Sequence, residues 1–307
     1  MITRDIASFL EAARGLGPDA GEPTARAAFL VMPEGFARAE QSAQDNRYMA
    51  DGAAFDANAA LAEHRALQAA LSASVPTLAF PGDARTPDAT FPNNVFATAR
   101  AGGEPRAIVG RMRHPVRQRE ALRADIRGFL GDVLGYPLVD LSAQPHPCEL
   151  TGALVVDRAR GLGFAGLSER CDEAGARLMH DAFGLRATLL FDLAPGEYHT
   201  NVVLAVLAGR AALVVPGGFA DPAAADAILS LYAPHGIALS AAEGAAFAAN
   251  AIALDPARVW MSARAEAALT DATRAALADA GFSVHSVPLD AIEAAGGSLR
   301  CCVAEIY

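Results

Sequence analysis

Five polar residues recur near the starts of hydrophobic runs at almost constant intervals along the sequence. They are Asn94, Glu149, His199, Asn250 and Cys301, and successive members lie 55, 50, 51 and 51 positions apart. Three of the five are the residue types of a thiol-dependent enzyme. Cys can act as a nucleophile, His as a base, and Glu as the carboxylate that orients the base, provided that they meet in space.

The hydrophobic runs around these residues follow a repeated order of elements. A period of about fifty residues is typical of repeat architectures, whose units bury their apolar faces against one another. Residues 153–191 give the clearest unit and predict two strands, a helix over 169–183 and a third strand. The same order recurs in units that begin NVFATA, NVVLAVLA and AIALD, with helices expected over 117–134, 221–232 and 263–280.

The fifth unit is split between the two ends of the chain. Residues 301–307 predict one strand and residues 28–33 the next, followed by a helix over 57–73 and a strand over 76–80. Pairing the N-terminal and C-terminal segments closes the ring and removes exposed strand edges. The expected fold is therefore α/β: a five-bladed α/β propeller of pseudo-five-fold ββαβ repeats.

The same pattern predicts the domain organisation. Residues 28–307 are expected to form a single propeller domain that carries the catalytic residues. Residues 1–27 are expected to form an N-terminal extension with a short helix, since Ile6, Phe9, Leu10 and Ala13 recur at helical spacing.

Each of the five marked residues lies at or just before the first strand of its unit, so their side chains are predicted to face one central cavity. Cys301 follows the glycine-containing segment 296–300 and is the preferred nucleophile. Cys302 is expected to point away, because successive side chains of a strand alternate. The competing interpretation is that both are buried structural cysteines, which are common.

His199 is the candidate base and acid, and Glu149 the carboxylate that fixes its tautomer. A zinc site built from His146, Cys148, Glu149 and His199 was the alternative chemistry. The intervals between these residues match no common ligand pattern. We therefore expect neither a metal site nor a cofactor.

The composition limits the partners. With 25 basic and 35 acidic side chains the net charge is −10, and the absence of a basic run argues against nucleic acid and anionic membranes. No stretch approaches the roughly twenty apolar residues of a membrane-spanning helix, and residues 1–15 do not have the pattern of a signal peptide. We expect a cytoplasmic protein with reduced cysteines and a small-molecule substrate; whether it forms a homo-oligomer stays open.

Taken together, the motifs resemble the guanidine-group-modifying enzymes, a superfamily of amidinotransferases and arginine deiminase-related proteins with a five-bladed α/β propeller, the pentein fold. The resemblance covers residues 28–307 and rests on DATFPNNVF (88–96), ELTG (149–152), GLSERCD (166–172), YHTN (198–201) and GGSLRC (296–301). It implies catalytic roles for Cys301, His199 and Glu149. It also implies that Arg170 and Arg111 bind a substrate carboxylate.

Two departures from the superfamily pattern concern the substrate. Arginine-using members of the resembling group carry Asp at the positions of Asn94 and Asn201, and a buried guanidinium without a counter-charge would weaken binding by about three orders of magnitude. A neutral ureido group suits these amides, since Asn both donates and accepts. The resemblance is strongest to citrulline-utilisation hydrolases, and it predicts hydrolysis of citrulline to ornithine, ammonia and carbon dioxide. Asn250 is expected to support the substrate cavity.

Three alternatives remain open at this point. The resemblance also permits an arginine or N-succinylarginine dihydrolase, or an amidine hydrolase like arginine deiminase and dimethylargininase. Asp88 or Asp45 could supply the missing negative charge, but their sequence positions do not place them. A non-catalytic binding propeller is the non-enzyme alternative, and the joint presence of Cys301, His199 and Glu149 argues against it.

Overall fold

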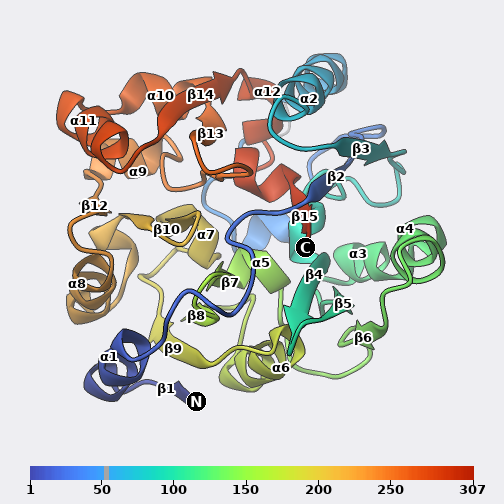
Figure 1. Cartoon of the computed structure of the whole chain (residues 1–307). Coiled ribbons are helices and arrows are strands. Elements are labelled where there is room, and N and C mark those ends of the chain that lie inside the picture. Colours follow the sequence, from blue (N-terminus) through green and yellow to red (C-terminus); the bar gives the residue numbers. More distant parts are fainter. Residues whose placement is uncertain (52–54) are drawn as a thin grey trace.

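Five small β-sheets surround a common centre in the computed structural model, which describes residues 1–51 and 55–307 (Figure 1). The three middle units of the chain each contribute one sheet, in which two antiparallel strands are followed by a parallel strand. The strands of these sheets are β4 (Phe96–Ala101), β5 (Glu104–Val109), β6 (Leu138–Asp140); β7 (Leu154–Asp157), β8 (Leu162–Leu167), β9 (Ala187–Asp192); β10 (Leu204–Leu207), β11 (Ala211–Val214) and β12 (Gly236–Ala238).

The two ends of the chain meet in one sheet. Strand β15 (Ala304–Ile306) pairs antiparallel with β2 (Ala27–Val31), and β2 pairs parallel with β3 (Thr77–Phe80). Helix α2 (Ala57–Leu71) connects β2 to β3. The predicted joining of the N-terminal and C-terminal segments is confirmed, as is the α/β propeller class of the fold.

The remaining sheet contains only β13 (Arg258–Ser262) and β14 (Ser283–Val287). The strand predicted over residues 251–255 is reduced to a single bridge, in which Ile252 and Trp260 exchange two backbone hydrogen bonds of 3.0 and 2.8 Å. Directly after it, the Asp255 carboxylate accepts the N–H groups of Ala257 and Arg258, and this turn ends the pairing.

The helices lie outside the sheets, and several depart from their predicted bounds. The segment predicted as one helix over 117–134 is broken into α3 (Pro115–Gln118), η4 (Glu120–Leu122), α4 (Ala124–Gly128) and the π-helical η5 (Phe129–Val133), because Arg123 adopts an extended conformation. The helix predicted over 263–280 is divided into α10 (Ala263–Ala268) and α11 (Asp271–Asp279), and Thr270 caps the second. Helix α6 (Glu173–Phe183) begins four residues later than predicted, and the side chain of Asp172 caps its N-terminus.

The other helical elements connect sheets or precede strands. They are α8 (Pro222–Leu231), α9 (Ala241–Ala245), α12 (Asp290–Glu293), η1 (Ser42–Gln44), η6 (Pro216–Gly218), η3 (Pro92–Asn94), α5 (Leu150–Ala153), α7 (Thr200–Val203) and η7 (Leu299–Cys302). Among the helices of residues 1–51 and 55–307, none has the length and hydropathy needed to cross a membrane.

Residues 1–27 pack against the propeller. Strand β1 (Ile2–Thr3) pairs with β9, and helix α1 (Ile6–Arg14) buries Phe9 and Ala13. The ring of Phe9 meets that of Phe164 edge-on with centroids 5.7 Å apart. The boundary between an extension and a domain at residue 27 stays a prediction.

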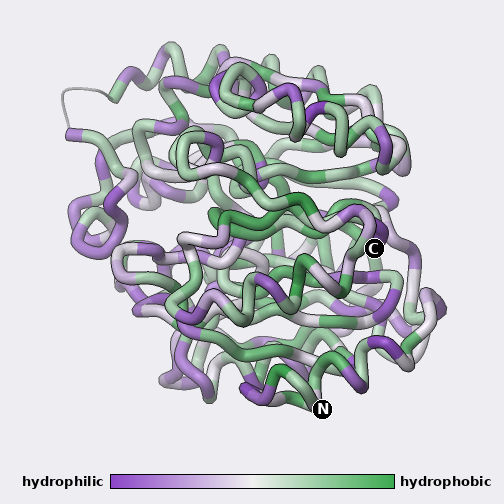
Figure 2. Tube along the Cα trace, turned by 90° about the vertical axis from the view of Figure 1, so that its left-hand side faces the viewer, coloured by the Kyte–Doolittle hydropathy of each residue, from purple (hydrophilic) through white to green (hydrophobic). Residues whose placement is uncertain are grey.

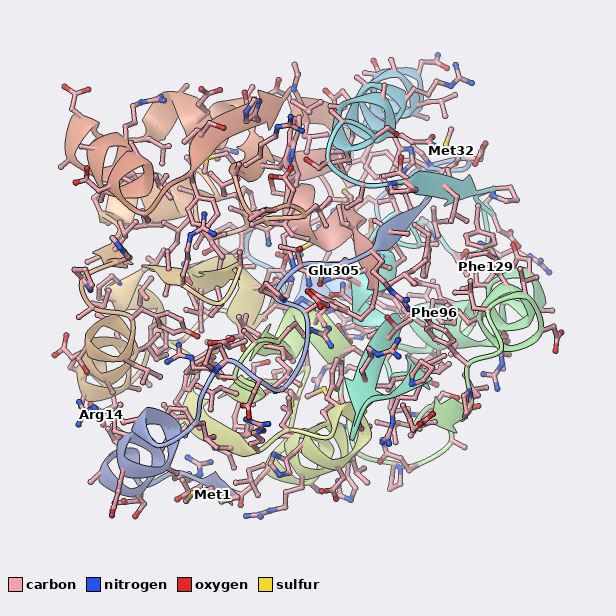
Figure 3. All side chains as sticks on the ribbon, in the orientation of Figure 1. Met1, Arg14, Met32, Phe96, Phe129 and Glu305 are labelled. Carbon is pink, nitrogen blue, oxygen red and sulfur yellow. The ribbon has the colours of Figure 1, made fainter. Side chains whose placement is uncertain are left out.

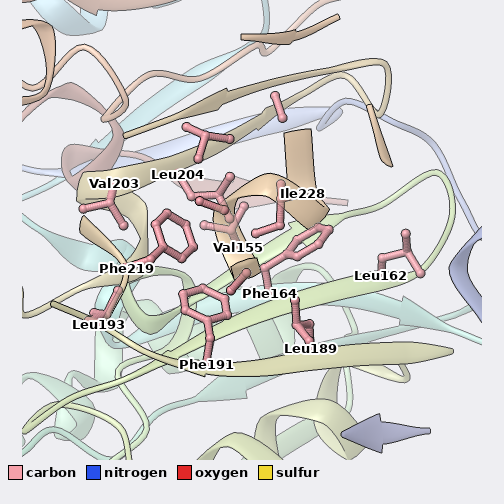
Figure 4. Close-up of a cluster of buried hydrophobic side chains, with 14 of the residues drawn as sticks. Val155, Leu162, Phe164, Leu189, Phe191, Leu193, Val203, Leu204, Phe219 and Ile228 are labelled. Carbon is pink, nitrogen blue, oxygen red and sulfur yellow. The ribbon is translucent and has the colours of Figure 1, made fainter. Parts of the chain in front are cut away.

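The hydrophobic cores lie between the sheets and their neighbours. Figure 4 shows one of them, where Phe191 of β9 stacks on Phe219 with ring centroids 4.8 Å apart. In Figure 2, hydrophobic stretches of the tube are frequent in the interior of the molecule, and hydrophilic stretches are frequent toward its edges. Glu305 and Phe96 lie toward the centre in Figure 3, whereas Met1, Arg14 and Phe129 lie at the periphery.

Candidate active site

Four of the five marked residues lie on or directly before short helical turns, and Asn250 lies in a bend; none lies on a strand. Asn94 ends η3, Glu149 precedes α5, His199 precedes α7, and Cys301 lies within η7. Turn α5 contacts both α7 and η3, and η3 contacts η7. The repeat therefore brings these turns together as predicted, although a helical turn separates Glu149 and His199 from the strands that follow.

His199 and Glu149 form a buried hydrogen-bonded pair. Nε2 of His199 lies 2.8 Å from Oε2 of Glu149, and the two side chains are 1% and 0% exposed. Glu149 also accepts from the guanidinium of Arg170 at 3.2 Å and from the backbone N–H of Arg113 at 3.0 Å. Nδ1 of His199 has no hydrogen-bond partner among the described residues. That nitrogen is the one available for proton transfer.

The surroundings set the charge states of this pair. Burial opposes ionisation of Glu149, but the Arg170 guanidinium and the bond from His199 outweigh it and hold the pKa of Glu149 well below its ordinary value. Burial lowers the pKa of His199 despite the nearby carboxylate. The pair is therefore an ionised carboxylate and a neutral imidazole near neutral pH.

The thiol of Cys301 is buried between two amides. Nδ2 of Asn250 donates to Sγ of Cys301 at 3.3 Å, and Sγ lies 3.8 Å from Oδ1 of Asn201. Burial raises the pKa of the Cys301 thiol, and the hydrogen bond from Asn250 is the largest opposing effect. Asn250 and Asn201 thus act on the sulfur, whereas the sequence placed Asn201 beside the substrate and gave Asn250 a role in the cavity wall.

Cys302 occupies the next position of the same turn and faces the protein core. Its thiol lies 3.6 Å from the carbonyl of Ser298, and its side chain packs in a hydrophobic cluster. Cys302 points away from the cavity as predicted. The reason is not strand alternation, because the segment is a 3-10 helix.

A small cavity of about 10 Å³ has both the imidazole of His199 and the thiol of Cys301 in its lining. Residues of the segment containing η1 and of several blades line this cavity. They are Ser42, Asn46, Met49, Asp88, Phe91, Asn94, Arg117, Arg170, Tyr198, His199, Ala295, Gly297 and Cys301.

Three residues that line this cavity, Ser42, Asp88 and Asn94, have a side-chain oxygen that is unsatisfied among the described residues. Asp88 and Asn94 are each 3% exposed, and Oδ1 of each has no hydrogen-bond partner within the described part of the chain. Burial raises the pKa of Asp88, and the guanidinium of Arg117 opposes that shift. Unsatisfied buried acceptors are costly, so these two oxygens indicate a ligand that donates N–H groups.

Arg170 lines the cavity, but its guanidinium is already engaged. It donates to Glu149, to Asp45 through Nε at 2.9 Å, and to the carbonyl of Ser42 at 3.0 Å. Arg170 precedes helix α6, which begins at Glu173. Its geometry supports orientation of Glu149, and its predicted role toward a substrate carboxylate stays a prediction.

Arg111 is absent from the described residues that line the cavity, and its predicted role toward a substrate carboxylate stays a prediction. Its guanidinium donates to the carbonyl of Ser142 at 2.8 Å. Two other arginines of the stretch GRMRHPVRQRE lie closer to the chemistry. Arg117 lines the cavity and pairs with Glu120 at 2.9 Å, and Arg113 pairs with Asp45 at 3.0 Å. The sequence alone could not show which of Arg111, Arg113 and Arg117 lies nearest to the reacting groups.

The sequence also missed Gly152. A Cβ at this position would lie 2.4 Å from Oδ1 of Asn94 and 2.8 Å from Nδ1 of His199. The sequence signal for Gly152 is its place in the motif ELTG, three residues after Glu149. Glycine is needed here because the imidazole and the amide both approach its backbone.

The zinc alternative finds no support in the geometry. Within residues 1–51 and 55–307, no three His, Cys, Asp or Glu side chains are grouped so that they could hold a metal ion. His146 instead pairs with Asp172 at the surface at 2.8 Å.

Comparison with known proteins identifies related chains. The family model described as N,N dimethylarginine dimethylhydrolase, eukaryotic, matches residues 32–307. The N(G),N(G)-dimethylarginine dimethylaminohydrolase of Mycobacterium tuberculosis (strain ATCC 25618 / H37Rv) is 31% identical over 201 residues, which are 66% of this chain and 61% of that protein. The matched region thus spans less than two thirds of that relative's length.

Two solved structures share the fold. The N-terminal domain of ArgZ, an arginine dihydrolase from the ornithine-ammonia cycle in cyanobacteria, was solved with bound product. It is 20% identical, with a TM-score of 0.78 over 92% of this chain and 97% of that chain. A dimethylarginine dimethylaminohydrolase variant in adduct with S-methyl-L-thiocitrulline is 21% identical, with a TM-score of 0.67 over 92% and 99%. At these identities the likeness shows the fold alone.

Proposed function

Since this chain belongs to the N,N dimethylarginine dimethylhydrolase family, within the guanidine-modifying pentein superfamily, we propose that it is a Cys-dependent hydrolase of guanidino C–N bonds. The proposed substrate is arginine, which the site hydrolyses first to citrulline and then to ornithine. The products are ornithine, two molecules of ammonia and carbon dioxide. The observation that carries the proposal is the buried Asp88 carboxylate, whose unsatisfied Oδ1 faces the same cavity as Cys301.

Asp88 can supply the negative charge whose absence at Asn94 and Asn201 favours citrulline in the sequence argument. A buried guanidinium needs a counter-charge, and Asn94 and Asn201 are neutral. Asn201 contacts the thiol and does not line the cavity, whereas Asp88 does. One carboxylate and one free amide oxygen can therefore accept N–H groups of a guanidinium.

In the proposed first hydrolysis, Cys301 is the nucleophile and His199 the acid and base. With the guanidinium bound, the Cys301 thiol gives its proton to Nδ1 of His199, and the resulting thiolate attacks the guanidinium carbon and forms a C–S bond. Nδ1 of the protonated His199 gives its proton to the departing ammonia, and the C–N bond breaks. The imidazole then takes a proton from water, which attacks the carbon and releases the thiolate with citrulline. Glu149 holds Nε2–H throughout.

The second hydrolysis uses the same groups on the ureido carbon of citrulline. Asn94 suits this step, since its amide can donate to the ureido carbonyl or accept from a ureido N–H. Attack by Cys301, departure of an amine and addition of water give ornithine, ammonia and carbon dioxide in total. Citrulline is thus an intermediate of the proposed reaction, and citrulline-specific hydrolysis is its second half.

The state of the thiol favours a cationic substrate. Burial raises the pKa of Cys301 and lowers that of His199, so both groups are neutral in the empty site near neutral pH. A guanidinium placed beside the sulfur stabilises the thiolate by charge attraction, whereas a ureido group brings no charge. Arginine would therefore help to generate its own nucleophile.

A dimethylarginine hydrolase is the second candidate, and the family match favours it. The reaction at Cys301 would be the same, but the first leaving group would be dimethylamine. The two unsatisfied acceptors argue for arginine, since methylation removes N–H groups that would donate to Asp88 and Asn94.

The test incubates the purified chain separately with arginine, citrulline, N-succinylarginine and dimethylarginine. Ammonia, dimethylamine and ornithine are counted, and Cys301→Ala serves as the blank. Two ammonias per ornithine from arginine, and one from citrulline, support the proposal. Inert arginine with active citrulline indicates the citrulline hydrolase, and dimethylamine release indicates the second candidate. No turnover of any of the four contradicts the proposed enzyme.

A further inference from the structure

Two free cysteines flank the ion pair that orients the site. Cys148 precedes Glu149 in the chain, and Cys171 follows Arg170, whose guanidinium bonds Glu149 at 3.2 Å. Both cysteines are fully buried, and neither is among the described residues that line the cavity. They take part in no step of the proposed reaction.

The backbone pairs these cysteines directly across an antiparallel bridge. The N–H of Cys148 donates at 2.9 Å to a carbonyl of a third segment, and both backbone groups of Cys171 are bonded to Ser168. The nearest bond between the two segments runs from the N–H of Glu149 to the carbonyl of Arg170, at 3.4 Å. Cys148 and Cys171 are thus a non-hydrogen-bonded pair, whose Cα atoms lie about 4.5 Å apart in such ladders.

This arrangement suits a disulfide. Linked cysteines have Cα atoms roughly 4.4–6.8 Å apart, and the side chains of a non-hydrogen-bonded pair lie on the same face. The thiols hold only weak contacts: Sγ of Cys148 accepts from the N–H of Arg111 at 3.4 Å, and Cys171 donates to the carbonyl of Asp172 at 3.5 Å. Gly175 packs closely beside Cys148, since a Cβ there would lie 3.2 Å from that of Cys148 and closer still to the carbonyl of Pro147.

We propose that Cys148 and Cys171 are a thiol-modification site that forms an intramolecular disulfide by exchange with a small disulfide such as oxidised glutathione. One cysteine thiolate attacks the small disulfide, which gives a mixed disulfide and releases one glutathione. The other thiolate attacks the protein-side sulfur and releases the second glutathione. Two cysteine thiols lose two electrons, the small disulfide is reduced to two thiols, and the two cysteine protons pass to them.

Burial makes this exchange slow in the folded protein. It raises the pKa of Cys148 to about 11 and that of Cys171 well above its usual range, and the thiolate is the attacking form. Once formed, the bond ties the segment of Glu149 to that of Arg170 and constrains the unfolded chain. The oxidised protein is expected to melt about 5 °C higher than the reduced protein.

The experiment equilibrates the full chain at about pH 8.5 with graded ratios of oxidised to reduced glutathione, so that a larger fraction of thiols is ionised. Remaining thiols are blocked with iodoacetamide, and tryptic peptides are mapped without reduction. Cleavage after arginine places Cys148 and Cys171 on separate peptides, 128–158 and 171–177, while Cys301 and Cys302 share peptide 301–307. Each disulfide is therefore identified by its peptide masses.

The expected result is a linked pair of peptides 128–158 and 171–177, with the higher melting temperature. Cys171→Ser and Cys148→Ser should show neither effect, and Cys171→Ala replaces them if a serine variant does not fold. The proposal is overturned if the peptides stay unlinked at the most oxidising ratio, if they link only in urea, or if the link leaves Tm unchanged. No turnover is measured, so the result is independent of the proposed function.

Discussion

His199 donates from Nε2 to Oε2 of Glu149 across 2.8 Å, and this bond decides which ring nitrogen faces the cavity. Glu149 is held ionised by Arg170, so it can only accept. The neutral imidazole must therefore carry its proton on Nε2 and present the lone pair of Nδ1. The remaining polar groups of the site can be understood from this fixed tautomer.

Replacing Glu149 with Gln is expected to lower kcat about a thousandfold or more, because an amide does not enforce the same tautomer or stabilise the imidazolium. The substrate contacts do not include this side chain, so KM should change far less than kcat. Steady-state kinetics of Glu149→Gln and wild type check this. An equal loss through KM alone would contradict the orienting role.

The same variant changes the dependence of stability on pH. The pKa of Glu149 is lower in the folded chain than in the unfolded chain, so its ionisation stabilises the fold above the ordinary carboxyl pKa. This contribution is lost as the pH falls from that value toward the lowered folded pKa. We expect Glu149→Gln to cost about 3–5 kcal/mol of unfolding free energy at pH 7. Urea unfolding should show the difference shrinking in acid.

Removing the nucleophile is expected to abolish turnover without unfolding the chain. Cys301→Ala should lower kcat by about four orders of magnitude or more, because no other described cysteine lines the cavity. Cys302→Ala is the matched control, since that thiol is equally buried but faces the core. Its activity per folded molecule should stay within about twofold of wild type. Substantial turnover by Cys301→Ala would rule out the assignment.

The reactivity of the Cys301 thiol is expected to depend on the side-chain amides of Asn250 and Asn201, which contact its sulfur. The raised pKa of Cys301 means that alkylation of the empty enzyme by iodoacetamide should keep accelerating above the ordinary thiol pKa. Asn250→Ala removes the N–H that donates to Sγ at 3.3 Å, so the pKa should rise further and alkylation near pH 8 should slow about tenfold. Rates against pH in a Cys302→Ala background check this. Unchanged rates would show that the bond is not made.

Gly152→Ala is expected to lower kcat about tenfold to a thousandfold while leaving the backbone unstrained, since Gly152 is not among the glycines with positive φ. Its Cβ would meet Oδ1 of Asn94 at 2.4 Å and Nδ1 of His199 at 2.8 Å, so one of them must move. Gly217→Ala is the control, because a Cβ there meets nothing within 4 Å. Equal kinetics for both variants would contradict the close approach.

The contact between His199 and Glu149 could be predicted from sequence because it follows from the repeat. Equivalent positions of a propeller converge, whatever their detailed conformation. The local conformation at those positions could not be predicted: Asn94, Glu149 and His199 each adjoin or end a helical turn of three or four residues, which is too short to show helical periodicity. For the same reason, the sequence predicted a strand at Cys302 where the structure has a short 3-10 helix.

Side-chain partners were harder to predict than convergence. Arg111, Arg113 and Arg117 share one stretch, and of the three Arg117 alone lines the cavity. Asn201 was assigned to the substrate because its position carries Asp in the resembling family, yet a 3.8 Å contact joins it to the thiol. Such partners depend on packing between blades, which local sequence does not encode.

Asp88→Asn tests the substrate assignment most directly. The change removes the carboxylate whose Oδ1 is unsatisfied in the cavity but keeps its volume, so arginine should lose about a hundredfold or more in kcat/KM. Citrulline carries no charge and should change less than about fivefold. Asn94→Asp is the complementary variant: a second carboxylate should favour arginine and disfavour citrulline. Both are compared by kcat/KM on each substrate, with Tm as the check on folding. Equal losses on arginine and citrulline would show that Asp88 supports the fold and does not hold the guanidinium.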